Sequence, residues 1–143
     1  MALWFAVGAI GVLVGILLIA VAREPGAAPA DVALAYEQAW DRLDFGTLFD
    51  LSGPELRDGA RRPGFVETKR AAYAGVPRGR LAARIAVENV VASEETALVV
   101  TNVFTSDEAA GNHAVRDNLV RNNVLMERRA GRWYVVAYSL RPG

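Results

Sequence analysis

The first hydrophobic segment of the chain is continuous and has no polar stripe. Residues 3–22 contain no charged side chain, and as a helix this run would be about 30 Å long, the thickness of a bilayer's hydrocarbon core. Trp4 lies near one end, where an indole favours the membrane interface. Arg23 and the residues that follow end the run. We therefore predict a transmembrane helix that contacts the lipid bilayer through Leu3–Ala22, with residues 1–23 as the anchor.

Three properties of this segment bear on its processing, orientation and pairing. Ala20-Val21-Ala22 has the small-x-small form of a signal-peptide cleavage site, although no positive region precedes the apolar run. Arg23 follows the span, and the positive-inside rule then favours a cytoplasmic domain of a single-pass cell-membrane protein. The pair Gly11 and Gly15 has the spacing that lets two membrane helices pack closely, so a homodimer through this helix face is one expectation.

Helical periodicity begins after a short linker, residues 24–28. Apolar residues then recur three and four positions apart, which predicts a helix with one buried stripe: Val32, Tyr36, Ala39, Trp40 and Leu43. Asp44 starts a second short helix, and Ser52 with Glu55 has the capping-box spacing that opens a third. We expect Pro63-Gly64 to break that helix and residues 65–73 to form another.

The period changes from 3.6 to 2 after Pro77. Alternating segments rich in β-branched and aromatic residues predict four strands: Leu81–Ala92, Thr96–Thr105, Val115–Arg128 and Trp133–Leu140. Short connections favour an antiparallel meander. Helices followed by strands indicate an α+β domain over residues 29–143, with the helices on one face of the sheet.

Several segments resemble the nuclear transport factor 2-like superfamily, which includes SnoaL-like cyclases and ketosteroid isomerases. They are the first helix with Tyr36 and Trp40, the Leu43-Asp-Phe45 turn, Ala97-Leu-Val-Val, and the hairpin Met126–Val136 with its Gly-Arg-Trp-Tyr-Val-Val end. The resemblance implies helices packed across a strongly curved four-stranded antiparallel sheet, around a conical pocket. Some members catalyse in that pocket, some bind a ligand there, and many dimerise through the sheet.

Composition and charge exclude several function classes. Formal net charge is zero, so the electrostatic attraction that drives nucleic-acid binding is missing. The chain has no cysteine, hence no disulfide framework or cysteine nucleophile. Acidic residues dominate from Asp31 to Glu55 and basic residues from Arg57 to Arg84. These segments form either two solvated faces that partly neutralise each other or a basic surface for anionic lipid.

The strands suggest which polar side chains face the pocket. Asn102, Asn122 and Tyr138 each alternate with apolar residues, and if those faces meet the helices they form polar points in an apolar cavity. The predicted pocket-lining residues are then Tyr36, Trp40, Asn102, Phe104, Asn122 and Tyr138. A register shifted by one residue would instead place the strand residues on the outer face.

Candidate chemistry is sparse. The resemblance implies an aspartate or histidine base with a tyrosine or protonated-aspartate donor, for which the candidate catalytic pair is Tyr36 with Asp58. His113 is the only histidine, so we expect no metal site, and no motif indicates a cofactor. The expected function is a membrane-tethered, non-catalytic binding domain that takes a small apolar ligand in the pocket or a partner, including a second copy, through the sheet. The alternative is a cyclase-, isomerase- or hydratase-like enzyme using the same pocket.

Overall fold

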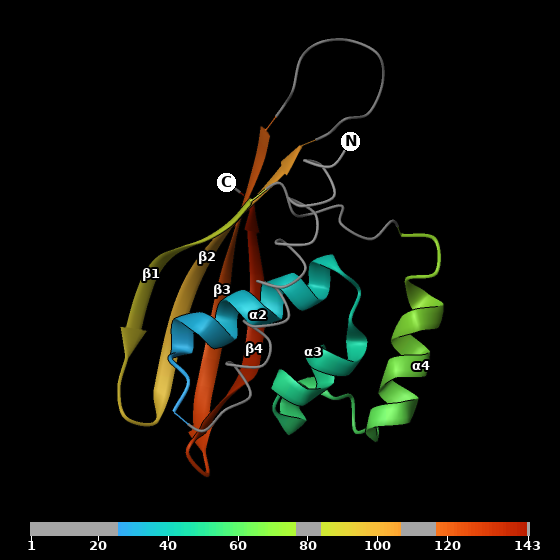
Figure 1. Cartoon of the computed structure of the whole chain (residues 1–143), viewed down its shortest axis with the longest axis horizontal. Helices are drawn as coiled ribbons and strands as arrows, with labels where there is room; N and C mark the ends of the chain where they lie inside the picture. The colour runs from blue at the N-terminus through green and yellow to red at the C-terminus, as the bar shows by residue number, and fades with distance from the viewer. Residues whose placement is uncertain (1–25, 77–83, 107–116, 143) are drawn as a thin grey trace, which may run out of the picture.

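The described part of the chain is an α+β domain. The computed structural model describes residues 26–76, 84–106 and 117–142. Three α-helices and one 3-10 helix come first, followed by four strands (Figure 1): α2 (Pro29–Asp41), α3 (Phe45–Leu51), η1 (Pro54–Leu56), α4 (Arg62–Ala72), β1 (Arg84–Ala92), β2 (Thr96–Ser106), β3 (Asp117–Arg129) and β4 (Arg132–Pro142). The strands form an antiparallel sheet in the order β1-β2-β3-β4. The predicted fold class is confirmed at this level.

The hydrophobic core lies between the helices and one face of the sheet. Helix α2 crosses that face, while α4 stands beside α3 on the side away from the strands (Figure 1). Buried apolar side chains of α2 and α3 meet those of the three later strands: Val32, Tyr36, Leu48, Leu51, Val99, Val124, Met126 and Val135. Burying a side chain of this size contributes roughly 1.5–3 kcal/mol, which makes this layer the main source of stability.

The helix boundaries have local causes, and two expectations about them are wrong. The Ser52 hydroxyl donates to the carbonyl of Leu48 at 2.6 Å instead of capping a new helix, and η1 begins after Gly53 without a side-chain cap. Pro63 does not break a helix but lies in the first turn of α4, because the amide that proline lacks is unpaired there in any case. Asp44 does begin α3, as predicted, and caps it.

Strands β3 and β4 contain a bulge and a tight turn. A bulge interrupts the β3–β4 register beside Leu125 and Met126, so that Val135 and Tyr138 both have partners on the inner face of β3. The β3–β4 turn consists of Ala130 and Gly131, with φ of 49° and 78°. Left-handed backbone at both central residues is the pattern of a two-residue hairpin whose twist matches the strands.

The predicted transmembrane segment lies outside the described residues. Within the ranges that the structure describes, no helix is both long and apolar enough to cross a bilayer.

Candidate functional site

The interior of the domain contains one carboxylate held by three uncharged donors. Glu37 projects from α2 and is only 2% exposed. Its Oε1 accepts hydrogen bonds from the Thr101 hydroxyl at 2.5 Å and from Asn122 Nδ2 at 3.0 Å, and its Oε2 accepts one from the Tyr138 hydroxyl at 2.9 Å. We call these four residues the Glu37 cluster. Since burial of an unpaired carboxylate is costly, the three donors are what permit it.

The sheet positions each donor. Thr101 and Asn122 are direct cross-strand partners on β2 and β3, so their side chains share the inner face. The β4 bulge turns Tyr138 to that face as well, opposite Val124. Asn122 Nδ2 also lies 2.8 Å from the Tyr138 hydroxyl. Glu37, Asn122 and Tyr138 therefore close a ring of hydrogen bonds between one helix and two strands.

Burial and charge keep the tyrosines of this region protonated. The pKa of Tyr138 is strongly raised, first by burial and then by the negative charge and hydrogen bond of Glu37. Burial also raises the pKa of Tyr36. Both hydroxyls therefore remain neutral donors at physiological pH, and the cluster places a phenol in direct contact with a carboxylate.

Four of the predicted pocket residues lie in this interior region. Asn122 and Tyr138 belong to the Glu37 cluster, and the ring of Tyr36 contacts that of Tyr138 at a centroid distance of 5.4 Å. Trp40 meets Tyr36 edge-to-face at 6.5 Å. The contact continues from Trp40 to Phe45, 6.4 Å away. These rings occupy the space between the helices and the sheet.

The other two predicted pocket residues lie on the opposite face. Asn102 and Phe104 alternate along β2 with Thr101 and Val103, which are buried in the core, so they point outward. The Arg84 guanidinium lies 4.7 Å from the centre of the Phe104 ring. The structure does not bring these two residues to Tyr36.

Asp58 is also remote from its proposed catalytic partner. Its side chain is 71% exposed and forms an ion pair with Lys69 at 3.5 Å, whereas Tyr36 is buried. His113 lies outside the described residues. Among those that are described, no three metal-ligating side chains gather in one place.

Sequence reasoning missed Glu37 as a site residue. The residue lies four positions after Ala33, within the buried surface of α2, and that spacing was the available signal. Because Glu37 lies in the acidic segment from Asp31 to Glu55, its charge favours the interpretation that it belongs to a solvated surface. The donors Asn122 and Tyr138 were recognised as polar residues among apolar ones, but their acceptor on the helix was not.

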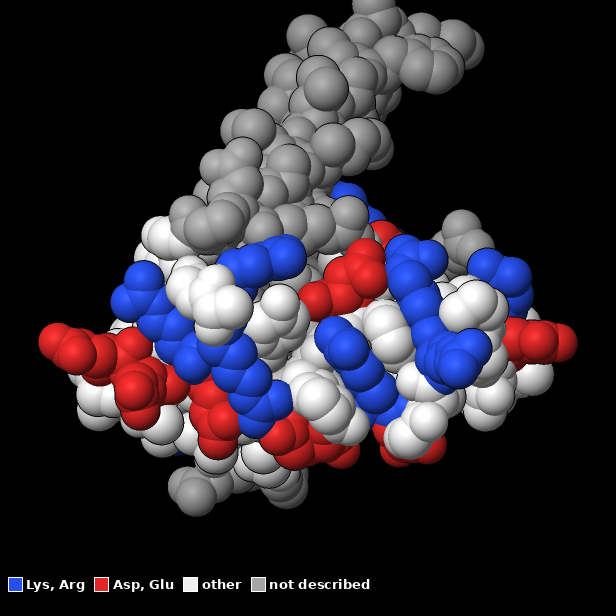
Figure 2. Space-filling model, turned by 90° about the horizontal axis from the view of Figure 1, so that it is seen from below, with Lys and Arg blue, Asp and Glu red and all other residues white. Residues whose placement is uncertain are grey.

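Surface charges of both signs are interspersed on the face seen in Figure 2. The acidic and basic segments meet in an ion pair between Asp50 and Arg62, with Nε and Oδ1 3.0 Å apart. Arg121 pairs with Glu88 at 2.8 Å. The ion pair between Asp50 and Arg62 agrees with two solvated faces that partly neutralise each other, while binding to anionic lipid stays a prediction.

The second notable feature is a pocket between α3 and α4, with a volume of about 730 Å³. Its lining residues come from the α2–α3 turn, the start of α3, and α4 with the residues after it. Phe45 and Tyr73, whose rings lie 5.7 Å apart, form part of its wall. No strand residue lines it, so it is separate from the Glu37 cluster.

Comparison with known proteins gives matches in structure only. No protein-family profile matches the chain, and no curated protein matches its sequence. A protein from Thiobacillus denitrificans, assigned as a calcium/calmodulin-dependent protein kinase type II association domain, is 14% identical with a TM-score of 0.59, over 81% of this chain and 95% of that one. A SEC-C motif containing protein from Rhodopseudomonas palustris is 16% identical, with a TM-score of 0.53 over 81% and 80%.

A third solved structure is less similar than these two. It is a Streptomyces avermitilis protein assigned as a dehydratase of the NTF2-like family, 16% identical, with a TM-score of 0.48 over 78% of this chain and 91% of that one. Identities this low concern architecture and not activity. What the likeness to the first two proteins shows is a shared fold, with helices packed on one face of a four-stranded antiparallel sheet.

Proposed function

We propose that the chain is a nuclear transport factor 2-like interaction domain, tethered to a membrane by residues 3–22, which pairs with a second copy through the outer face of its sheet. The observation that carries this proposal is an exposed apolar row across all four strands. Val91, Leu98, Leu125 and Ala137 are consecutive cross-strand partners. Val91 is 61%, Leu98 37% and Leu125 42% exposed.

Physical considerations favour a second copy as the partner. A continuous apolar patch of this kind marks an interaction site more often than isolated exposed residues do. A row exposed on one sheet face can meet its own copy about a twofold axis, the commonest symmetry of soluble oligomers. Tethering would confine both copies to one plane, which raises their local concentration and lowers the affinity that pairing requires.

The interior is less suited to a ligand. Aromatic side chains occupy the space beside the Glu37 cluster, and the carboxylate already accepts three hydrogen bonds. A ligand reaching Glu37 would have to displace packed rings, which costs the contacts they make. We therefore place binding at the sheet rather than in the predicted conical pocket.

Cross-linking of the full chain in membranes tests this proposal. Because the chain has no cysteine, Leu125→Cys introduces a unique thiol in the apolar row, and Glu67→Cys places a matched thiol on the exposed surface of α4. We expect oxidation to give a covalent dimer at position 125 and not at 67. Adding Leu98→Glu should abolish the cross-link, since it places a charge in the interface.

Two outcomes separate this interface from other modes of pairing. The cross-link at position 125 should persist when Gly11 and Gly15 are both changed to Leu, because these substitutions affect only the membrane helix. Equal cross-linking at positions 67 and 125, or its retention with Leu98→Glu, would reject the sheet interface.

An enzyme is the second candidate, favoured by the direct contact of Glu37 with Tyr138. A buried carboxylate beside a neutral phenol is suited to proton transfer at a carbon acid. Cyclohexenone in deuterated buffer is a suitable probe, with exchange followed by NMR. Exchange that is faster with the wild type than with Glu37→Gln would support catalysis, and identical rates would remove this candidate for carbon acids of that size.

A further inference from the structure

The pocket between α3 and α4 has an unbalanced charge. Three arginines and one aspartate line it, Arg42, Arg62, Arg70 and Asp44, which gives a formal charge of +2. Anions are the ligands that such a surface attracts. Its volume of about 730 Å³ is in the range that holds a small organic molecule.

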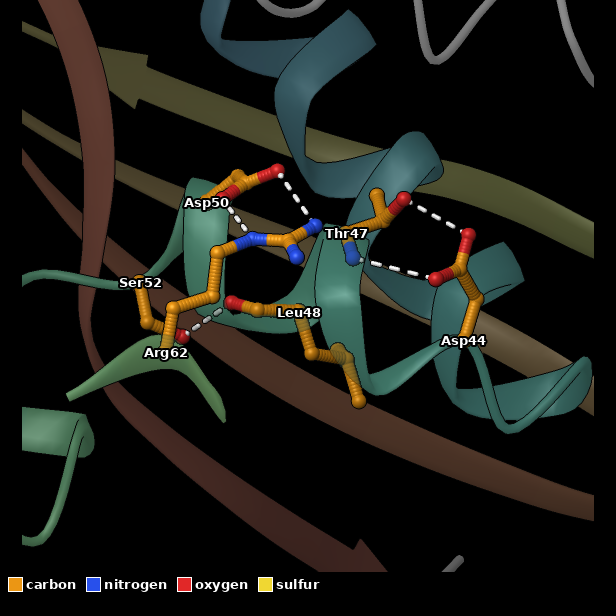
Figure 3. Close-up of polar contacts among 6 residues, drawn as sticks. All are labelled: Asp44, Thr47, Leu48, Asp50, Ser52 and Arg62. Carbon is orange, nitrogen blue, oxygen red and sulfur yellow. Dashed lines mark hydrogen bonds and ion pairs between the residues drawn. The ribbon is translucent and has the colours of Figure 1, made fainter. Parts of the chain in front are cut away.

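Two of the four charges are already engaged. Asp44 accepts hydrogen bonds from the Thr47 amide at 3.1 Å and from the Thr47 hydroxyl at 2.6 Å, which caps α3 (Figure 3). Arg62 reaches across α3 and donates to Asp50, with Nε 3.0 Å from Oδ1 (Figure 3). Within the described part of the chain, the side chains of Arg42 and Arg70 have neither an ion pair nor a hydrogen bond.

The remainder of the wall is apolar. The rings of Phe45 and Tyr73 and the side chain of Val66 all line the pocket. Phe45 is fully packed against the core on its other side, so the wall is held in place by the hydrophobic layer. A ligand that satisfies both parts of the pocket has an anionic group and an aromatic or short aliphatic body.

Two local backbone features shape the wall of the pocket. Leu43 has a φ of 52°, a conformation uncommon for a branched residue, and it turns the chain sharply between Arg42 and the start of α3. A Cβ at Gly46 would lie 2.7 Å from Arg62 Nη2. Only glycine therefore leaves room for the guanidinium to lie along α3 without shifting.

We propose that this pocket binds a small amphipathic anion, a carboxylate or phosphate attached to an aromatic or short aliphatic group. Arg42 and Arg70 hold the anionic group, and Phe45 and Tyr73 pack against the apolar body. Guanidinium groups suit this role because their donors match the oxygens of carboxylates and phosphates. This site is independent of the sheet interface and of the Glu37 cluster.

Calorimetric titration of the full chain in non-ionic detergent tests the assignment. The probe is phenyl phosphate, with inorganic phosphate as the anion alone and benzyl alcohol as the apolar part alone. We expect phenyl phosphate to bind at submillimolar concentration and each of the other two at least tenfold more weakly. Arg70→Gln and Arg42→Gln should each weaken phenyl phosphate binding about tenfold. Arg61→Gln removes a neighbouring exposed charge that does not line the pocket, and it should change the affinity less than twofold.

Three results would overturn the proposal. The first is the absence of a heat of binding with phenyl phosphate at concentrations up to about 5 mM, which would saturate a site of submillimolar affinity. The second is an equal loss of affinity in Arg61→Gln and Arg70→Gln, which would indicate a diffuse charge effect. The third is equal affinity for phenyl phosphate and inorganic phosphate, which would exclude a contribution from the aromatic wall. Urea midpoints of each variant exclude loss of folding as the cause.

Discussion

Replacing Tyr138 with Phe isolates one contact of the Glu37 cluster. The substitution removes a single hydroxyl that donates to Glu37 Oε2 at 2.9 Å and accepts from Asn122 Nδ2 at 2.8 Å. A hydrogen bond to a charged group contributes about 1.5–3 kcal/mol. The ring itself stays in contact with Tyr36, so little packing is lost. We expect Tyr138→Phe to lower the free energy of unfolding by about 2 kcal/mol, which corresponds to a fall of roughly 8 °C in Tm for a domain of this size.

Urea unfolding followed by tryptophan fluorescence measures this effect. Trp40 and Trp133 lie in the domain and report on its core. Tyr134→Phe is the control, because it removes a hydroxyl from the same strand at a half-buried position, and we expect it to change stability by less than about 0.5 kcal/mol. A double-mutant cycle compares Tyr138→Phe, Glu37→Gln and the double variant. We expect the two substitutions to show a coupling energy of about 1 kcal/mol or more. If Tyr138→Phe is as stable as the wild type, the Tyr138 hydroxyl does not stabilise the buried Glu37 carboxylate, and the reasoning is refuted.

Three further substitutions or conditions test other parts of the structure. The pKa of Tyr138 is raised above its ordinary value of about 10, so the folded state holds the phenolic proton more tightly than the unfolded state. The resulting contribution to the free energy of unfolding is complete below about pH 10 and declines as the pH rises further. Urea titrations at alkaline pH should therefore show a shallower loss of stability with pH in Tyr138→Phe than in the wild type. Asp44→Ala removes the cap of α3, and its urea midpoint should correspond to a loss of about 1 kcal/mol. Ala130→Asn replaces a residue at a φ of 49° with one that tolerates this conformation, and it should raise Tm by an amount equivalent to about 0.5–1 kcal/mol.

The helices and strands were predictable because their patterns are local. The alternation of residues 96–105 identified a strand, and β2 spans Thr96–Ser106. Alternation alone did not predict which residues of each strand point toward the helices. The bulge beside Met126 changes which β4 residues point inward, and the position of α2 over the sheet decides that Thr101, not Asn102, meets the helix. Both depend on contacts between distant segments, which the pattern of one strand does not contain.

The same limit applies to the two candidate sites. Asn122 and Tyr138 were expected to share a cavity, and they do contact each other, but the acceptor Glu37 was read as part of a charged surface segment. The α3–α4 pocket was not foreseen at all. Its arginines come from positions 42, 62 and 70, and only the packing of α4 beside α3 brings them to one place.

The strand order has a consequence for how the chain folds. Every strand pairs with its neighbour in sequence, so the sheet can grow one hairpin at a time with little loop-closure entropy. The Glu37 contacts, in contrast, join residues 64, 85 and 101 positions apart. During synthesis α2 is made before all four strands, and the last donor to its carboxylate, Tyr138, comes from the last strand. Closure of the Glu37 cluster is then a late step, which locks α2 onto a sheet that has already formed.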